Sequence, residues 1–322
     1  MTDQPVRWGI LGAARFARQH MAPAIHAAEG AELAALATSS AEKFAEFAAF
    51  APGITHHTSY DDLLGDPNID AVYIPLPNHL HVDWAIKALE AGKHVLCEKP
   101  VGMDVAQIDR LIAVRDQTGL LAAEAYMIVH HPQWRRAKKL IADGTVGELC
   151  HVNAAFTFRN LDQGNIRNQA EKGGGGLRDI GLYTLGSARW ATGQEPERLS
   201  HARVQMEHGV DVFADVGFDF PGFTYQGFTS IRMANRQVVH FHGTEALLTL
   251  TCPFNANVFD QAELHIKRPD GSTTVERFAG VNQYVLQVQN FGRSIRQGAS
   301  YPWTLEQARG TQAMLDQILA TV

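Results

Sequence analysis

The segment RWGILGAARFA, residues 7–17, joins an apolar run to a turn made of small residues. A short apolar run that leads into Gly and Ala is typical of a buried strand, a tight turn and the start of a helix. Dinucleotide-binding domains carry the pattern G-x-G-x-x-G at this turn. If Gly12 holds the first position, Ala14 and Ala17 replace the second and third glycines. Alanine is small enough to let the backbone approach a pyrophosphate, so the segment predicts a dinucleotide site with a weakened pattern.

The position of this turn in the chain supports the interpretation. The turn follows the first expected strand and opens a helix, where N–H groups and the helix dipole attract phosphate. We therefore expect the cofactor to contact Gly12, Ala14, Arg15 and Phe16. A packing turn between a helix and a sheet would use the same small residues, and the sequence leaves that alternative open.

The second apolar run, ELAALAT, ends at Thr38 and is followed by Ser39, Ser40 and, one turn later, Lys43. An enzyme selective for NAD(H) places a carboxylate about 20 residues beyond the glycine turn, where it bonds the ribose hydroxyls. Hydroxyls and an ammonium group suit a 2′-phosphate instead. We expect these two serines and the lysine to bind that phosphate, so that NADP(H) is preferred over NAD(H). A serine that caps a helix beside an exposed lysine would give the same sequence.

Two kinds of hydrophobic pattern divide the chain. Up to about residue 121, short apolar runs alternate with segments of helical period, which predicts β-α units and a parallel sheet buried on both faces. From about residue 149, apolar and polar residues alternate between Gly, Pro and Asn turns, which predicts antiparallel strands. The expected fold class is α/β plus α+β: a doubly wound parallel sheet in residues 1–123 and a large, mostly antiparallel open sheet in residues 124–322. We expect the last helix to pack back on the first domain.

Composition limits the partners that the protein can have. The 322 residues carry a net charge of -6 and no basic cluster, which argues against a nucleic-acid partner. No run approaches the about 18 apolar residues of a membrane helix, and the N-terminus has no signal-peptide pattern. We therefore expect a cytoplasmic protein without membrane contact. Three widely spaced cysteines, and histidine pairs without a third ligand nearby, predict reduced thiols and no metal site.

Three further motifs carry a resemblance to a known family. They are YIPLPNHLH at residues 73–81, CEKPVG at residues 97–102 and GGGGLRDIGLY at residues 173–183. Together with the glycine turn, they resemble the glucose-fructose oxidoreductase / inositol dehydrogenase (Gfo/Idh/MocA) family over essentially the whole chain. The resemblance implies a Rossmann domain with an E-K-P motif, followed by a C-terminal α+β domain. The third motif ends in tyrosine, as in the dihydrodiol and xylose dehydrogenase branch of the family.

The resemblance implies a second group of cofactor residues, around the nicotinamide half. They are Pro75, Leu76, Asn78 and His81 along the nicotinamide, with Glu98 and Lys99 beside its ribose. Lys99 follows an expected parallel strand, at the carboxyl end where open α/β sheets bind ligands. The resemblance also implies that this lysine reaches a hydroxyl group of the substrate.

Asp179 and Tyr183 lie four residues apart on an expected helix and therefore share one face. Moving a hydride between nicotinamide and a carbinol or carbonyl carbon requires a proton exchanged at the oxygen. A phenol has a pKa of about 10, and a nearby cation favours its ionised form. We expect Tyr183 to be the proton relay, Lys99 to tune it, and Asp179 to orient a substrate hydroxyl or the lysine. The glycines at 173–176 are expected to form a flexible approach, free of side chains, to this helix.

Two other segments resemble substrate-binding parts of the family. The segment NIRNQAEKGGGG resembles the family's N-I-R segment, which makes Arg167 a candidate to contact the substrate or hold the pocket. The segment EAYMIVHHPQW, residues 124–134, adds Tyr126 as a candidate. The same segment has Val129 where the family usually has arginine, so the substrate preference of the most similar branches is not carried over.

These observations predict an NADP-dependent oxidoreductase that acts on a sugar, polyol or related hydroxyl or carbonyl compound. Alternating strands between residues 213 and 241 leave a second sheet face to cover, and the resemblance implies that this face forms a homodimer, or a tetramer. The alternative is an NAD(P)-sensing binding protein of the same fold that regulates partners without turnover. The set Lys99, Asp179 and Tyr183 favours the enzyme, because a sensor needs only the cofactor site.

Overall fold

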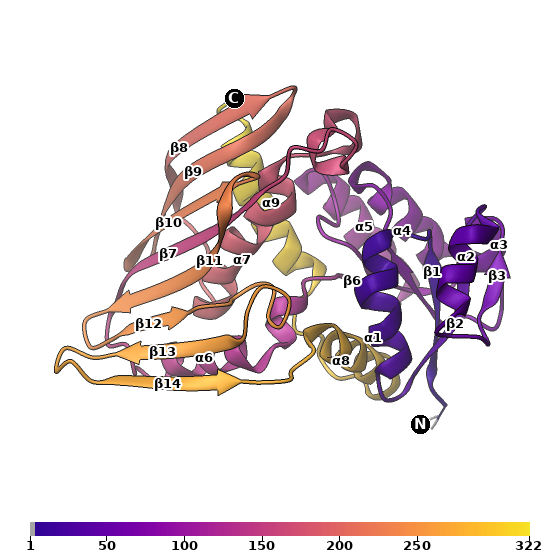
Figure 1. The fold of residues 1–322 in the computed structure, drawn as a ribbon, viewed down its shortest axis with the longest axis horizontal. Coiled ribbons are helices and arrows are strands. Elements are labelled where there is room, and N and C mark those ends of the chain that lie inside the picture. Colours follow the sequence, from indigo (N-terminus) through magenta and orange to yellow (C-terminus); the bar gives the residue numbers. More distant parts are fainter. Residues whose placement is uncertain (1–3) are drawn as a thin grey trace. The chain divides into compact units, whose positions relative to one another are not determined.

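The computed structural model describes residues 4–322, and the chain divides into two compact units (Figure 1). The first unit extends to His130 and also contains Asn282–Glu306, and the second contains His131–Val281 and Gln307–Val322. The chain therefore crosses from the first unit to the second, returns, and crosses again. In residues 4–322, no helix combines the length and the apolar character needed to cross a membrane.

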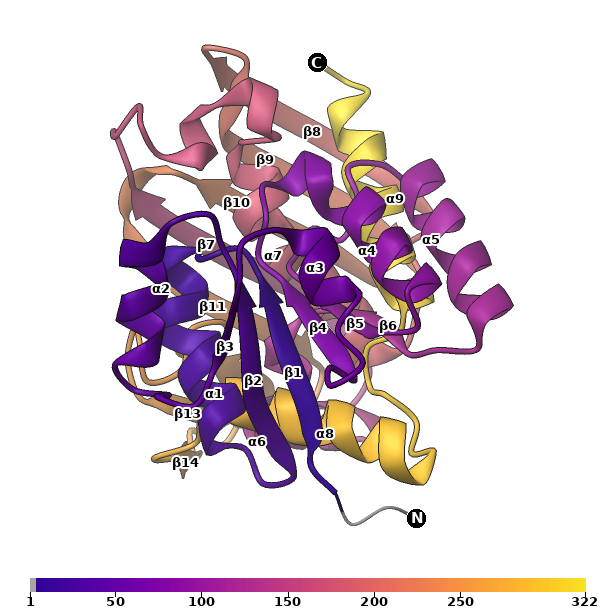
Figure 2. The same cartoon turned by 90° about the vertical axis from the view of Figure 1, so that its right-hand side faces the viewer.

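The first unit is built on a six-stranded sheet in which every neighbouring pair of strands is parallel (Figure 2). The strands are β1 (Val6–Leu11), β2 (Ala31–Ala37), β3 (Thr55–His57), β4 (Ala71–Ile74), β5 (His94–Cys97) and β6 (Ala122–Glu124). Their order is β3-β2-β1-β4-β5-β6, so the chain direction across the sheet reverses between β1 and β4. Open α/β sheets bind ligands at the carboxyl ends of the strands on either side of such a reversal.

Helices and helical turns complete the first unit. They are the π-helical η1 (Ala17–Met21), α1 (Ala22–Ala27), α2 (Ala41–Ala48), α3 (Tyr60–Leu64), the 3₁₀ turn η2 (Asn78–Leu80), α4 (His81–Glu90), α5 (Val105–Thr118), the 3₁₀ turn η3 (Met127–His130) and, from the returning chain, α8 (Gln283–Gln297). Helix α8 packs against α1 and β2, and its Phe291 ring lies 5.1 Å from the ring of Trp8 on β1. Strands β1 and β4 are buried almost throughout, as a parallel sheet covered on both faces requires.

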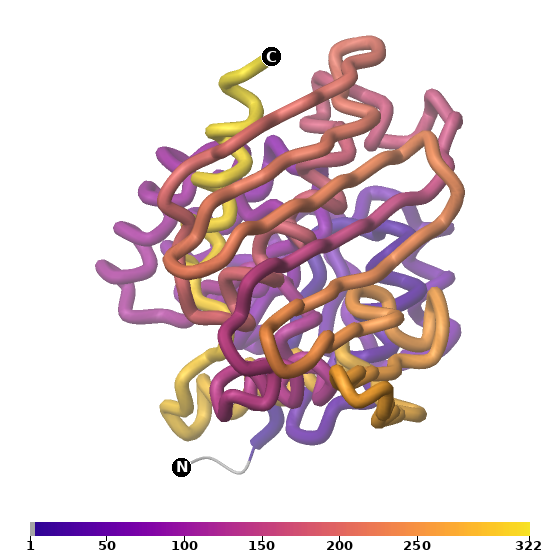
Figure 3. The backbone as a smooth tube through the Cα atoms, turned by 90° about the vertical axis from the view of Figure 1, so that its left-hand side faces the viewer, coloured from indigo at the N-terminus to yellow at the C-terminus, as the bar shows by residue number. Residues whose placement is uncertain are grey.

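The second unit is built on an eight-stranded sheet (Figure 3). The strands are β7 (Leu149–Arg159), β8 (Arg198–Glu207), β9 (Val210–Phe220), β10 (Phe223–Ser230), β11 (Arg232–Gly243), β12 (Leu247–Leu250), β13 (Ala262–Lys267) and β14 (Thr273–Phe278). Their order is β14-β13-β12-β11-β7-β10-β9-β8, and β7 pairs with β10 in parallel while the other pairs are antiparallel. The predicted fold class, a parallel doubly wound sheet followed by a mostly antiparallel one, is confirmed.

One face of this second sheet carries helices. The helical segments of the unit are α6 (Pro132–Ala142), the 3₁₀ turns η4 (Ile166–Asn168) and η5 (Ala170–Lys172), the π-helical η6 (Leu177–Gly181), α7 (Leu182–Thr192) and most of α9 (Leu305–Leu319). Helix α7 packs on β7 and β10, and α6 packs on α7 and β13. Trp134 of α6 is fully buried, and its indole N–H donates to the carbonyl of Pro253 over 2.6 Å. The packing of the last helix on the first domain stays a prediction.

Candidate active site

The turn after β1 has the backbone geometry that a dinucleotide turn requires. Gly12 has φ of +99°, a conformation that strongly favours glycine, and its N–H donates to the carbonyl of Ala37 over 2.9 Å. A Cβ at this position would lie 3.0 Å from Leu76 Cδ2 and 3.2 Å from the hydroxyl of Tyr60. Gly12 thus brings the ends of β1 and β2 and the segment after β4 close together, at the reversal of strand order.

A helical segment begins directly after this turn, at Arg15. The first N–H groups of a helix have no partner within the helix, so they are available to an anion. Arg15 is exposed, whereas the ring of Phe16 packs edge-on against Tyr284 of α8 at 5.7 Å. Small residues, a left-handed glycine and an open helix start are the features that fit a bound diphosphate.

The residues after β2 are compatible with both interpretations of the sequence: a site for a 2′-phosphate and a serine cap beside an exposed lysine. Ser40 is the N-cap of α2, and its hydroxyl accepts from the N–H of Lys43 over 3.2 Å. The side chain of Lys43 is exposed, as is Ser39. A capping hydroxyl that accepts one hydrogen bond still has its own proton to donate. No carboxylate lies between Thr38 and Ala41, so the local charge of this segment remains compatible with a phosphate.

The segment after β4 packs inside the first unit. Pro75 and Asn78 are half-buried and Leu76 is buried. His81, the first residue of α4, is fully buried, and each of its ring nitrogens lies 2.7 Å from a backbone carbonyl oxygen. Both nitrogens are therefore engaged inside the protein, and the expected contact of His81 with a cofactor stays a prediction.

Glu98 and Lys99 follow β5 and are both half-buried. The hydroxyl of Tyr73 donates to Glu98 Oε1 over 2.5 Å, and the N–H of Lys99 donates to Glu98 Oε2 over 3.3 Å. Burial raises the pKa of the Glu98 carboxyl, and the charge of Lys99 opposes that rise. Burial also raises the pKa of Tyr73 well above its usual range, so its hydroxyl stays protonated and keeps donating. These bonds hold the Glu98 carboxylate beside the E-K-P backbone.

Tyr126 and Val129 are both buried in the first unit. The Tyr126 ring stacks on Trp303 with 4.1 Å between ring centroids. The indole N–H of Trp303 donates to Glu124 Oε2 over 2.9 Å. Tyr126 is thus part of an ordered aromatic and carboxylate cluster, and its expected contact with a substrate stays a prediction.

The glycine run ahead of α7 is closely packed, so the expectation of a flexible approach is wrong. A Cβ at Gly174 would lie 2.6 Å from the carbonyl oxygen of Ile166 and 2.7 Å from that of Arg167. Gly175 has φ of +116°, donates its N–H to the carbonyl of Arg167 over 2.9 Å, and has no room for a Cβ beside Asp211 Oδ1. The glycines therefore let the start of the helix dock against the segment that carries Arg167.

This docking brings two predicted site residues into contact. The guanidinium of Arg167 donates from Nε to Asp179 Oδ2 over 2.5 Å and from Nη2 to Asp179 Oδ1 over 3.2 Å. Asp179 is largely buried in this two-point ion pair, while about a third of the Arg167 side chain stays accessible. A bidentate pair fixes the carboxylate in orientation as well as in position.

Tyr183 lies one turn beyond Asp179, where the π-helical segment Leu177–Gly181 passes into α7. Its ring is 5% exposed and lies 6.0 Å from the Phe156 ring and 5.7 Å from the Phe254 ring. A single π-helical turn inside an α-helix is frequent at functional sites. The turn and the two phenylalanines hold the phenol in one place on the same helix start as Asp179.

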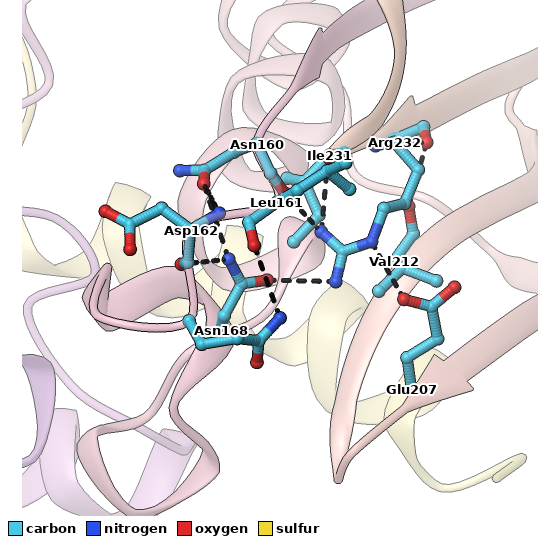
Figure 4. A network of polar contacts seen from close by, with 10 residues as sticks. Asn160, Leu161, Asp162, Asn168, Glu207, Val212, Ile231 and Arg232 are labelled. Carbon is cyan, nitrogen blue, oxygen red and sulfur yellow. Dashed lines mark hydrogen bonds and ion pairs between the residues drawn. The ribbon is translucent and has the colours of Figure 1, made fainter.

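An arginine on β11 supports this arrangement and was not predicted. The Arg232 guanidinium donates to the Asn160 carbonyl over 2.6 Å, to Asn168 Oδ1 over 3.0 Å and to Glu207 Oε2 over 2.8 Å (Figure 4). Arg232 therefore ties both ends of the segment 160–168, which contains Arg167, to the sheet. The only sequence signal was a charged residue at the start of a strand, which is too common to identify such a role.

Asp211 on β9 is the second residue that sequence reasoning missed. Its Oδ2 accepts the N–H of Leu177 over 2.7 Å, at the first turn of the helix that carries Asp179 and Tyr183. The carboxylate is buried, and burial raises its pKa to about 6, although bonds to Leu177 and the charge of Arg178 act in the opposite direction. Asp211 therefore caps the helix from another strand of the sheet.

Comparison with known proteins places this geometry in a family. Residues 6–126 match the model of the oxidoreductase family with an NAD-binding Rossmann fold (GFO_IDH_MocA), and residues 134–249 match the model of the GFO/IDH/MocA C-terminal domain. The chain belongs to the Gfo/Idh/MocA oxidoreductase family. The predicted family and its class of chemistry are thereby confirmed.

Several relatives of this Gfo/Idh/MocA chain span nearly its whole length. An uncharacterized oxidoreductase of Rhizobium meliloti is 40% identical, over 97% of this chain and 96% of the relative. An NADP(+) D-xylose 1-dehydrogenase of Haloferax volcanii is 33% identical, over 97% and 95%. The structure of a 3-ketoreductase from Actinomadura kijaniata, in complex with NADP and TDP-benzene, matches with a TM-score of 0.90 and 31% identity over 98% of each chain. Structures of that ketoreductase with a tyrosine replaced by phenylalanine, or a lysine replaced by alanine, match as well.

The Asp211 cap makes a prediction about stability. A carboxyl with a folded pKa of about 6 and an ordinary pKa of 3.8 binds more protons in the folded state between these values. Its contribution to the free energy of unfolding therefore falls as pH rises from about 4 to about 6, by about 3 kcal/mol at 1.36 kcal/mol per pKa unit. In Asp211→Asn this fall is absent, so the variant gains stability relative to the wild type by about that amount across the window.

Urea unfolding of both proteins at a series of pH values measures this difference. Asp219→Asn is the matched control, because Asp219 is a carboxylate on the same strand that pairs with the exposed Arg198. The same pH-dependent difference in Asp219→Asn would show that the effect does not come from the burial of Asp211. A constant difference for Asp211→Asn would contradict the assignment of a buried carboxyl with a raised pKa.

Proposed function

We propose that this Gfo/Idh/MocA chain is an NADP(H)-dependent oxidoreductase that acts on the hydroxyl or carbonyl group of a sugar, polyol or related small compound. The observation that carries the proposal is the helix start on which Asp179 pairs with Arg167 and Tyr183 follows one turn later. The relatives support it, because a D-xylose dehydrogenase and a 3-ketoreductase are both named as using or binding NADP. The expected cellular compartment is the cytoplasm.

The cofactor residues we propose fall into two groups. The phosphate and adenosine half would be held by Gly12, Ala14, Arg15 and Phe16, and the 2′-phosphate by Ser39, Ser40 and Lys43. The nicotinamide half would be lined by Pro75, Leu76 and Asn78, with Glu98 and Lys99 beside its ribose and His81 behind it. When bound, the nicotinamide supplies or accepts the hydride. The fit rests on the left-handed Gly12, the open helix start and a segment between Thr38 and Ala41 that contains no carboxylate.

We propose that Tyr183 exchanges the proton at the substrate oxygen. A phenol within reach of a cation can release and regain a proton in the neutral pH range. Lys99 is the proposed cation, and it would also donate to the same oxygen as negative charge develops there. The two phenylalanines that pack around the Tyr183 ring keep its hydroxyl from rotating away, which supports a fixed proton donor.

We propose that Asp179 and Arg167 bind the hydroxyl groups of the substrate. A carboxylate offers about four lone-pair positions, so Asp179 can accept from a sugar hydroxyl as well as from Arg167. The Arg167 side chain is about a third exposed, and its guanidinium carries five N–H donors, so we propose that it donates to a second oxygen of the substrate. Tyr126 remains a proposed substrate contact. Val129 supplies an apolar side chain where the family usually has arginine, which suits a substrate with fewer anionic groups near that position.

The alternative is a protein that senses NADP(H) and regulates a partner without turnover. A substrate panel, followed by the absorbance of NADPH, distinguishes the enzyme from the sensor. The panel contains aldoses, ketoses, anhydrosugars, inositols, dihydrodiols and keto-deoxysugar nucleotides. Turnover of any member supports the enzyme. NADPH binding with no turnover across the panel would favour the sensor.

Replacing Tyr183 tests the proton relay. We expect Tyr183→Phe to lower kcat by roughly 10²–10⁴-fold, the usual contribution of a positioned acid or base, with little change in NADPH affinity. Tyr225→Phe is the matched control, because Tyr225 is another buried tyrosine of the second unit, on β10. Full turnover by Tyr183→Phe on a substrate of the wild type would rule out the relay.

Replacing Lys43 tests the cofactor preference. A charge-assisted bond to a phosphate contributes about 1.5–3 kcal/mol, so we expect Lys43→Ala to raise the KM for NADPH about tenfold and leave that for NADH unchanged. Lys87→Ala is the control, since Lys87 is an exposed lysine of the same unit that pairs with Asp61. An unchanged ratio of NADPH to NADH efficiency would remove Lys43 from this role.

We propose a homodimer, alone or within a tetramer, through the face of the second sheet that α7 does not cover. Phe228 of β10 points to that face, with the Arg236 guanidinium 5.3 Å from its ring. Light scattering should give at least twice the chain mass of 35.4 kDa. Phe228→Asp should lower the mass to one chain, because a charge placed opposite its own copy repels it. A single-chain mass for the wild type would refute the dimer.

A further inference from the structure

The ring of His81 has an unusual pair of partners. It is fully buried at the start of α4, with Nδ1 2.7 Å from the carbonyl oxygen of Pro100 and Nε2 2.7 Å from that of Leu76. A carbonyl oxygen can only accept a hydrogen bond, and a neutral imidazole carries one N–H. A neutral ring would therefore hold the lone pair of one nitrogen against a carbonyl lone pair at hydrogen-bonding distance. An imidazolium, which has two N–H donors, satisfies both oxygens.

The two carbonyls belong to the two segments that form the nicotinamide side of the proposed site. Leu76 lies between β4 and α4, and Pro100 directly follows Lys99 after β5. The last main-chain bond between these strands runs from the N–H of Glu98 to the carbonyl of Ile74 over 3.0 Å. Beyond that bond, the His81 ring spans from one segment to the other. Its two hydrogen bonds therefore act as a cross-link where the β-ladder has ended.

We propose that His81 is a buried imidazolium that cross-links these two segments and so positions the nicotinamide half of the cofactor and Lys99. This inference rests on the proposed function for its meaning, but the protonation of the ring can be measured without any turnover. His81 acts through Leu76 and Pro100, so it is a positioning residue. The imidazolium also places a fixed positive charge between Leu76 and Pro100, inside the first unit.

Several charges bear on the protonation of this ring. Burial lowers the pKa of His81, and the charges of Lys99 and His79 lower it further, while the bonds to Pro100 and Leu76 raise it. Glu98 follows the neighbouring strand, and Asp83 on α4 is exposed and paired with Arg110 of α5.

Nearby, Glu124 of β6 accepts from the N–H of Val101, the residue after Pro100. Burial is the largest of these influences and lowers the pKa of His81. Our proposal requires the two short charge-assisted bonds, each about twice as strong as a neutral one, to compensate for it, since the neutral ring would lose one bond and gain a repulsion.

Nitrogen-15 NMR of the full chain with saturating NADP(+) tests the protonation directly. The His81 signals are assigned by their loss in His81→Gln, or by correlation with the backbone if that variant fails to fold. We expect both ring nitrogens of His81 to show bound protons at pH 7.5. A single protonated nitrogen at pH 7.5 would overturn the proposal.

Affinity for two nucleotides tests the positioning role. His81→Phe keeps the size of the ring and removes both donors. We expect it to weaken binding of NADP(+) about tenfold and to leave binding of 2′-phospho-ADP-ribose, which lacks nicotinamide, unchanged. General destabilisation would weaken both equally, and such a result would overturn the positioning role. His26→Gln is the control and should change neither affinity.

These measurements separate this inference from the proposed function. A wild type that binds NADP(+) and has a neutral His81 contradicts the cross-link and leaves the oxidoreductase proposal intact. A wild type that binds neither nucleotide contradicts the proposed function, while the protonation of His81 in the free chain still decides the imidazolium.

Discussion

The carboxylate of Asp211 occupies the space that the glycines before α7 leave open, and the candidate site of the second unit depends on that contact. A side chain at Gly175 would displace the carboxylate, and one at Gly174 would push away the segment that carries Arg167. In either case the helix start would lose its cap, its ion pair or both. The position of Tyr183 thus follows from close backbone packing and not from helix propensity alone.

The contact between Asp211 and the helix start also lowers the free energy of unfolding near neutral pH, because it buries a carboxylate. A carboxyl buried on β9 ionises less readily than one in water, which is why the pKa of Asp211 rises to about 6. A neutral cap would avoid this cost, but an anion interacts more strongly with the N–H groups and the dipole of a helix start. Groups whose pKa is shifted by burial are frequent at functional sites, because positioning is favoured there at the expense of stability.

Features encoded within a few residues could be predicted from the sequence, whereas features that join distant segments could not. The left-handed Gly12, the two kinds of sheet and the placement of Asp179 and Tyr183 on one helix all follow from local patterns. Asp211 lies 34 residues after the N–H that it caps, and Arg232 lies 72 residues after Asn160. Strand periodicity indicates which residues alternate, but not which strand lies beside which. For the same reason the parallel pairing of β7 with β10 had no signal in the sequence.

Each unit contains backbone groups that lack a partner within a helix or strand, and each unit satisfies them with a buried charge. The two charges have opposite signs. Where a helix begins, unpaired N–H groups need an acceptor, and Asp211 supplies an anion. Where two strands have ended, carbonyl groups need a donor, and on our assignment His81 supplies a cation. Apolar packing cannot fill either role, because it leaves these backbone groups without partners. Both charges are buried, so salt screens them far less than an exposed pair such as Arg110 and Asp83. The geometry around Asp211 in the second unit and around His81 in the first should therefore persist at high ionic strength, even where the binding of an anionic cofactor weakens.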